Sequence, residues 1–202
     1  MLGLIQEDNM RKVFLVLLFG LSLLASNTWA VDSYKMDPAH TMLGFTAKHM
    51  MVSNVNGSFD KFSGQVIYDP KDLANSKIDL TIEVSSINTR NEKRDAHLKS
   101  ADFFDAANFP TITFVSKKIT ATEITGDLTI KGVTKEISIP ATIDGPVKGM
   151  MGDVIGINAT FTLNRQDYGL NWNKTLDQGG LAVGNDVTVN ISIEADKQEA
   201  AK

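Results

Sequence analysis

Residues 124–143 read ITGDLTIKGVTKEISIPATI, and they contain two stretches in which apolar and polar residues alternate. The first stretch ends at Lys131-Gly132, a pair typical of a turn, and the second begins directly after it. A period of two is typical of a β-strand with one buried face, because successive side chains point to opposite sides of a sheet. The segment therefore predicts two β-strands separated by a turn.

The same period recurs along the rest of the chain and predicts about eight strands in all. Further alternating stretches lie at residues 41–49, 62–68, 78–84, 112–116, 155–163 and 187–195. The only helical candidate is residues 91–107, which we expect to lie across one end of the fold. Regularly spaced strands with one short helix indicate an antiparallel sandwich or barrel.

Periodicity does not separate a sandwich from a barrel, because both bury one face of every strand. Two features favour a barrel. Residues 76–88 and 185–196 are long for single strands, and several glycines inside strands permit the bending that closure needs. These glycines are Gly44, Gly64, Gly126 and Gly156. We expect an all-β, eight-stranded antiparallel barrel over residues 31–196, with residues 197–202 as a flexible end.

The N-terminus is typical of a secretory signal peptide. Met10-Arg11-Lys12 is cationic, residues 13–25 are apolar, and small residues stand at Thr28 and Ala30. We expect cleavage after Ala30 and export to the periplasm, with no membrane-spanning segment left after processing. A retained membrane anchor is the alternative, although the apolar run is short for one. Residues 1–9 resemble a mis-called start or an upstream extension.

Composition excludes several functions. The chain has no cysteine, so thiol catalysis, thiolate metal sites and redox motifs are absent. The formal net charge of −4 gives no electrostatic reason to bind nucleic acid. The 172 residues after the signal suit one domain with a sizeable core. The oligomeric state stays open, with a homodimer as the commonest assembly of soluble proteins.

Catalytic and metal sites have weak signals. The sequence has no G-x-S-x-G elbow, and nothing in the chain order brings His40, His49 or His97 to a serine. A metal site on these histidines with Asp95 is an alternative, but the spacing lacks the compact pairing typical of such sites. We therefore expect no catalytic residues, no metal and no cofactor.

At the level of motifs, the chain resembles the YceI-like family. The residues that carry this resemblance span nearly the whole chain after residue 30: Tyr34-x-Met-Asp-Pro-x-His40, Phe45, His49, Gly57-x-Phe59, Phe62-x-Gly64, Ile87-x-Thr89, Arg94-Asp95-x-His97-Leu98, Asp102-Phe103-Phe104, Phe109-Pro110-x-Ile112-x-Phe114-x-Ser116, residues 126–134 (GDLTIKGVT) and Arg165-x-Asp167-Tyr168-Gly169. The resemblance implies a lipocalin-like barrel in the periplasm that holds a polyisoprenoid or similar amphiphile in an elongated cavity. It also implies links to isoprenoid-quinone handling and stress-induced expression, without established catalysis.

We therefore expect a ligand-binding barrel interior with apolar walls and a polar end. The expected walls are Phe45, Ile82, Phe114, Leu128, Ile157 and Phe161. The polar end, suited to a quinone ring or a phosphate, is expected at His49, Arg94, His97 and Arg165. Further expected contacts are Phe59, Phe62, Leu98, Phe103, Tyr168 and Trp172. Two rival functions stay open: an enzyme acting on such a lipid, and a stress-protection protein whose barrel is filled by its own side chains.

Overall fold

The computed structural model describes residues 31–150, 152–177 and 179–199. The expected signal peptide at residues 1–30 and the last three residues of the chain lie outside this part. Its strands are β1 Asp32–Met36, β2 Met42–His49, β3 Ser53–Phe59, β4 Phe62–Tyr68, β5 Lys77–Glu83, β6 Ile87–Asn88, β7 Thr111–Ile119, β8 Glu123–Ile130, β9 Val133–Lys148, β10 Asp153–Asn164 and β11 Val183–Lys197. Three 3₁₀ turns, η1 Leu73–Asn75, η2 Val84–Ser86 and η3 Arg165–Tyr168, and one α-helix, α2 Glu92–Lys99, complete the described elements.

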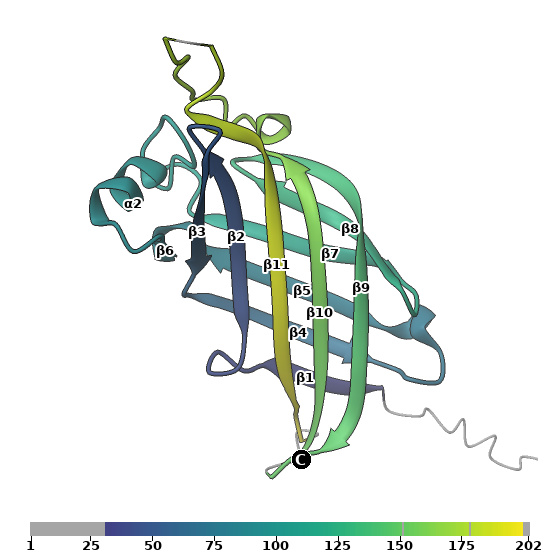
Figure 1. Ribbon diagram of the computed structural model, residues 1–202. Coiled ribbons are helices and arrows are strands. Elements are labelled where there is room, and N and C mark those ends of the chain that lie inside the picture. The colour runs from purple at the N-terminus through teal and green to yellow at the C-terminus, as the bar shows by residue number, and fades with distance from the viewer. Residues whose placement is uncertain (1–30, 151, 178, 200–202) are drawn as a thin grey trace, which may run out of the picture. The chain divides into compact units, whose positions relative to one another are not determined.

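The sheet closes into an antiparallel barrel, as expected. Its order is β1-β4-β5-β7-β8-β9-β10-β11-β2-β3-β6, and β1 also pairs with β11. The eleven segments form eight barrel strands, because β1 and β2, β3 and β4, and β5 and β6 are each two parts of one strand. In Figure 1, β2 and β9 to β11 form the near wall, and β4, β5 and β7 cross behind them.

Each interrupted strand breaks at a place where neighbouring strands still hold it. Between β1 and β2, the Asp37 backbone N–H donates to the Glu194 carbonyl of β11 at 2.9 Å. Between β3 and β4, the Asp60 N–H donates to the Ser86 carbonyl at 3.2 Å. The breaks therefore bend the sheet without opening it, which is the usual effect of an irregularity in a barrel.

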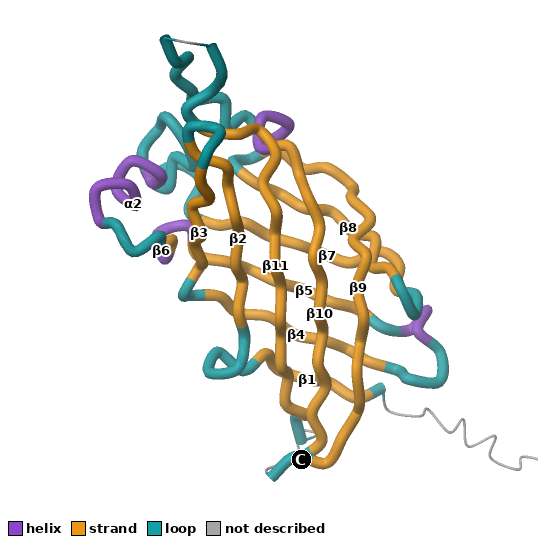
Figure 2. The backbone as a smooth tube through the Cα atoms, in the orientation of Figure 1, coloured by secondary structure: helices purple, strands orange, loops and turns teal. Residues whose placement is uncertain are grey.

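The helix is shorter than expected. Asn91 caps α2 by accepting a hydrogen bond from the Arg94 N–H at 3.0 Å, and the helix ends before Ser100. The expected range of 91–107 was too long, because the chain turns back after Ser100: the Phe103 N–H donates to its carbonyl at 3.1 Å. Asp105 then adopts a positive φ of 52°, which a helix does not allow. Figure 2 shows α2 beside β6, at one end of the barrel.

The far end of β11 is more ordered than expected. The strand continues to Lys197, whose ammonium pairs with Asp32 at 2.7 Å, and the Gln198 N–H donates to the Ser33 carbonyl at 2.7 Å. Residues 197 and 198, of which the first was expected in the flexible end, are therefore held against β1.

One end of the barrel is filled by its own side chains. Tyr34, Val66, Ile155 and Ala195 are at most 1% exposed, and the Tyr34 ring meets the Tyr68 ring edge-on at 6.4 Å between centroids. We call these residues, together with Met36, the plug. Because Tyr34 and Ala195 come from the two strands that close the sheet, the plug also fixes the closure.

A glycine makes room for an aromatic ring in the barrel wall. A Cβ placed on Gly126 of β8 would lie 2.6 Å from Cζ of Phe114 and 2.5 Å from the Val115 carbonyl oxygen on β7. Both distances are too short for real atoms, so an added methyl group must displace the ring and the neighbouring strand. Gly126 is therefore needed for β7 and β8 to pair at this point.

We predict that Gly126→Ala lowers the free energy of unfolding by about 1–3 kcal/mol in urea denaturation, because overpacking forces the ring and backbone to shift. Gly156→Ala is the matched control on β10, since the nearest atom to its added Cβ lies 3.9 Å away. We expect this control to be neutral or slightly stabilising. Equal effects of the two changes would contradict the steric explanation.

Candidate functional site

Beyond the plug, the barrel is hollow. A cavity of about 200 Å³ runs through the remaining interior, and carbon atoms form almost all of its surface. On β11 its lining extends from Val183 to Ile193, so at about 3.3 Å per residue it follows roughly 33 Å of strand. With the usual barrel tilt this corresponds to about 25 Å along the axis. The cavity is therefore long, narrow and apolar.

The alternation of the strands builds the cavity wall. On β10 the odd-numbered residues Ile157, Ala159, Phe161 and Leu163 line it, while Thr160 and Thr162 are exposed on the outside. The same face is inward on β11, because Ala159 pairs with Ile191 and Phe161 pairs with Val189. Antiparallel partners directly opposite each other lie on the same face of a sheet, so one pattern lines the whole bore.

Most of the expected contact residues lie along this cavity. All six expected wall residues line it, as do Phe59, Leu98, Phe103, Arg165 and Tyr168. His49, Phe62, Arg94, His97 and Trp172 do not line it. Phe62 packs against the core, and His49 is exposed at the end of β2.

The wall also contains residues outside the expected set. They include Leu43, Ala47, Phe104, Leu170, Val187, Val189 and Ile191. Val187, Val189 and Ile191 belong to an alternating apolar stretch like those of the expected wall residues. The alternation could therefore have identified them as cavity-lining residues. Phe104 and Leu170 lie in irregular segments, where no periodicity identifies an inward side chain.

The expected polar end does not form at Arg94. The Arg94 guanidinium donates to the Thr89 hydroxyl and the Thr89 carbonyl, each at 2.7 Å. Asp95 binds the same hydroxyl at 2.5 Å and accepts the Thr89 N–H at 2.9 Å. Both charged groups thus hold the turn between β6 and α2 instead of facing the cavity.

His97 belongs to an aromatic cluster that joins two segments. Its ring meets Phe103 at 5.0 Å and Trp172 at 4.8 Å between centroids, both edge-on, and its Nε2 lies 2.9 Å from the Asp102 carboxylate. Phe103 in turn contacts Trp172 at 5.2 Å. The cluster ties the α2 segment to the chain that follows η3, so it covers the end of the barrel opposite the plug.

Arg165 lines the cavity but directs its donors to backbone carbonyls and to the Asn185 side-chain oxygen. Its Nε donates to the Gly184 carbonyl at 3.0 Å, one Nη donates to the Leu170 carbonyl, and the other donates to the Val183 carbonyl at 3.4 Å. Burial lowers the pKa of this guanidinium. Arg165 therefore joins η3 to the start of β11, and the side chain leaves the cavity surface apolar.

Tyr168 closes the wall beside Arg165. Its side chain is 2% exposed, its hydroxyl has no partner among the described residues, and burial raises the pKa of the phenol. The Lys135 ammonium lies 5.9 Å from the ring centroid.

A family model for the YceI-like domain matches residues 34–195. This range includes all the strands of the barrel except the first two residues of β1 and the last two of β11. The chain belongs to the YceI-like family. A UPF0312 protein of Staphylococcus aureus (strain MSSA476) is 45% identical over 166 residues, covering 81% of this chain and 97% of the relative. Another, from strain MRSA252, is 47% identical with the same coverage.

Solved structures share the YceI-like fold. BcnA of Burkholderia cenocepacia superposes with a TM-score of 0.69 at 26% identity, covering 79% of this chain and 98% of BcnA. The Campylobacter jejuni YCEI protein gives a TM-score of 0.63 at 35% identity, covering 76% and 90%. A polyisoprenoid binding domain from Saccharophagus degradans gives 0.61 at 15% identity, covering 82% and 98%, and this likeness concerns the fold alone.

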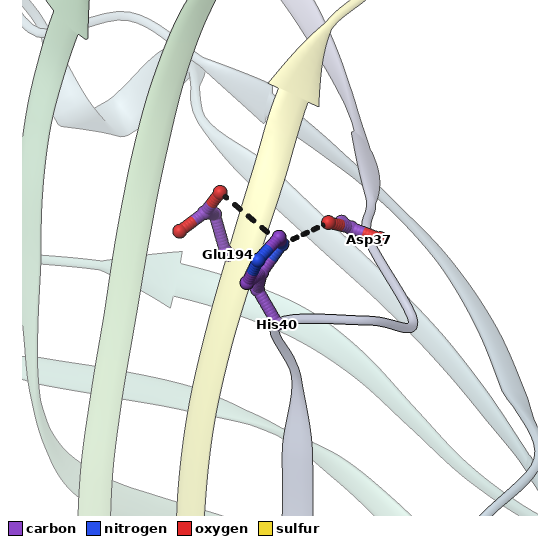
Figure 3. A group of neighbouring side chains, drawn as sticks. All are labelled: Asp37, His40 and Glu194. Carbon is purple, nitrogen blue, oxygen red and sulfur yellow. Dashed lines mark hydrogen bonds and ion pairs between the residues drawn. The ribbon is translucent and has the colours of Figure 1, made fainter. Parts of the chain in front are cut away.

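Away from the cavity of this YceI-like barrel, one group of side chains has the composition of a metal site. Within residues 31–150, 152–177 and 179–199, only Asp37, His40 and Glu194 offer three suitable ligand atoms within 4.8 Å of one another. Figure 3 shows His40 between the two carboxylates, 2.5 Å from Asp37 and 3.8 Å from Glu194. The alternative metal set, His40 with His49, His97 and Asp95, is not brought together. The group ties the break between β1 and β2 to β11.

We predict a pH-dependent stability from His40 in this YceI-like chain. The hydrogen bond to Asp37, followed by the charge of Glu194, raises the pKa of His40 above 6.5. A raised folded-state pKa stabilises the fold fully below the unfolded value, and that stabilisation is lost as the pH rises through the folded value. His40→Gln should therefore lower the Tm more at about pH 5.5 than at about pH 8.5. A Tm difference that stays constant over this range would rule out the ion pair as its cause.

Among the described residues, no helix combines the length and apolar character needed to cross a membrane.

Proposed function

We propose that this YceI-like protein binds one long apolar chain, in the class of polyisoprenoids or isoprenoid quinones, for carriage or storage. The single observation that carries the proposal is the narrow apolar cavity beyond the plug. Because its surface is almost wholly carbon, the inserted part of the ligand must be hydrocarbon, since a buried polar group without a partner is unfavourable. A polar head group then stays outside the bore, at the end covered by α2 and η3.

The dimensions support a single slender chain. A cavity of about 150 Å³ holds one benzene ring, so about 200 Å³ accommodates roughly eight carbon atoms of a slender chain, or between one and two isoprene units. At about 0.8 kcal/mol per buried carbon, these contribute up to about 6 kcal/mol before the entropic costs of binding. The polyisoprenoid binding domain of Saccharophagus degradans has the same fold, which makes polyprenols the first ligands to test.

A binding role is favoured over an enzyme acting on the same lipid. An enzyme would need convergent titratable groups beside the reacting part of the chain. The charged groups nearest the cavity instead bind other parts of the protein: Arg165 binds backbone carbonyls, and Arg94 and Asp95 both bind Thr89. The rival in which the barrel is filled by its own side chains describes the plug end, whereas the rest of the interior is hollow.

The direct test is to purify the protein from its native host without detergent, extract it with organic solvent and analyse the extract by mass spectrometry. We expect a polyprenyl or similar long-chain compound in a stoichiometric amount. An extract that contains no such compound, together with failure of the purified protein to take up short polyprenols, would contradict the proposal.

We predict that Phe161→Asp reduces affinity for a short polyprenol by at least about tenfold, because it places a charge on the cavity wall. Thr160→Asp is the matched control, since its side chain is on the outer face of the same strand. Ala159→Phe is a second, uncharged change that fills the bore. Affinities are measured by fluorescence competition, with circular dichroism to verify folding. Retained affinity in both folded cavity variants would exclude the bore as the binding site.

We also propose that the protein is exported and processed before it binds its ligand. Residues 1–30 carry the features of a signal peptide, although their structure lies outside the described part. We predict that mass spectrometry of the periplasmic fraction finds a mature chain beginning at Val31. Recovery of the protein only from the cytoplasm, with residues 10–30 still attached, would disprove the export step.

A further inference from the structure

The turn between β2 and β3 carries apolar side chains in an unfavourable backbone conformation. Val52 N–H donates to the His49 carbonyl at 3.1 Å, and the two central residues, Met50 and Met51, have φ values of 51° and 61°. Positive φ at both central positions is typical of a type I′ turn, which favours Asn-Gly. The other non-glycine residues with positive φ in the described part are Arg90, Asp105 and Lys131, all of them polar.

The three residues of this turn are exposed to solvent. Met50 is 41% exposed, Met51 is 54% exposed and Val52 is 80% exposed. We call the three residues the Met tip. Backbone strain that persists at an exposed apolar turn is a reason to look for a function there, because turn preference does not account for the residues and each of them stays at least 41% exposed.

The Met tip stands at the end of the barrel opposite the plug. The Met50 N–H donates to the Ala182 carbonyl at 2.9 Å. The tip follows the last residue of β2, and Ala182 directly precedes the first residue of β11, at the same end of the barrel (Figure 1). Ala47 of β2 and Val183 of β11, a few residues inside the turn, line the cavity. Any chain that enters the bore therefore passes close to the tip.

The small size of the Met tip and the charged residues beside it favour a lipid surface over a protein partner. A stable dimer buries about 800 Å² per partner, which three side chains on one tight turn do not supply. A bilayer needs no such area, because a few apolar side chains enter its interfacial region individually. The exposed Lys48 and Lys174 flank the tip, whereas residues 170–182 contain a single acidic residue, Asp177. Lysines close to a membrane surface favour binding to anionic lipids.

We propose that the Met tip inserts into the surface of a phospholipid bilayer and so brings the end of the cavity opposite the plug to the membrane. The bound chain then passes between bilayer and bore without crossing water. This inference rests on the proposed function, since only a membrane-soluble ligand gives the contact a purpose.

The test uses the double change M50N/M51G, which supplies the residues that the turn prefers. We expect flotation with vesicles of phosphatidylethanolamine and phosphatidylglycerol to show at least about a tenfold lower partition of the variant than of the wild type. The same variant should unfold at a higher urea concentration, because the backbone strain is removed. A merely structural role for the two methionines predicts the opposite change in stability.

Met150→Ser is the matched control, because Met150 is a fully exposed methionine on a different turn, between β9 and β10 at the plug end. It should partition like the wild type. The proposal is overturned if the wild type does not float with the vesicles or if M50N/M51G floats equally well. It is also overturned if sedimentation velocity shows a dimer that only the variant lacks.

Uptake of a short polyprenol from detergent-free buffer separates this inference from the proposed function. We expect M50N/M51G to retain its equilibrium affinity and to lose only the transfer from vesicles. Vesicle binding by a wild-type protein that takes up no polyprenol would leave the membrane contact standing and contradict the proposed function alone.

Discussion

Closure of the sheet along β11 is the constraint on which the interior depends. β11 pairs with β10 on one side, and with β2 and then β1 on the other. A shift by one residue in either pairing would turn the inward side chains outward, because side chains alternate across a strand. Closure also leaves the barrel wall held by backbone hydrogen bonds rather than by packing alone. The wall can therefore remain in place around an interior that is not filled.

The apolar interior has two parts: the plug is packed like an ordinary hydrophobic core, and the cavity is not filled. In the plug, Tyr34, Val66 and Ile155 are buried as completely as in any packed interior. Around the cavity, Phe161, Val189 and Ile191 are only partly buried and face the empty bore, so they lack some of the dispersion contacts that a filled core would give. A hydrocarbon chain in the bore would supply those missing contacts. The packed plug keeps the barrel closed around the part of the interior that is not filled.

The sequence was most informative where a regular strand period exists. Alternation predicted the strands and a shared face that includes Phe45, Phe114 and Phe161, since the period of a strand determines which side chains share a face. Strand length and glycines within the strands favoured a barrel over a sandwich. The breaks between β1 and β2 and between β5 and β6 were not predicted, because each depends on hydrogen bonds to another strand. The helix was predicted too long because its end after Lys99 depends on a turn around Ser100.

The polar contacts could not be predicted in the same way. Arg94, His97 and Arg165 were expected to bind a polar head group, but their partners in the structure are a hydroxyl, aromatic rings and backbone carbonyls that no spacing reveals. The positive φ of Met50 and Met51 was equally hidden, since it is a property of the folded turn and not of their residue type. A charged side chain in a sequence indicates that a partner is needed, without saying which one.

The filled end of the barrel has one more consequence. Tyr34, Tyr68 and Ile155 fill the barrel at the plug end, so under the proposed function a ligand chain enters and leaves at the opposite end. A second molecule then cannot displace the first by entering from the plug side. The part of a bound chain that exceeds the cavity would stay outside the barrel, so the position of the plug, and not the length of the chain, sets how much of the chain is buried.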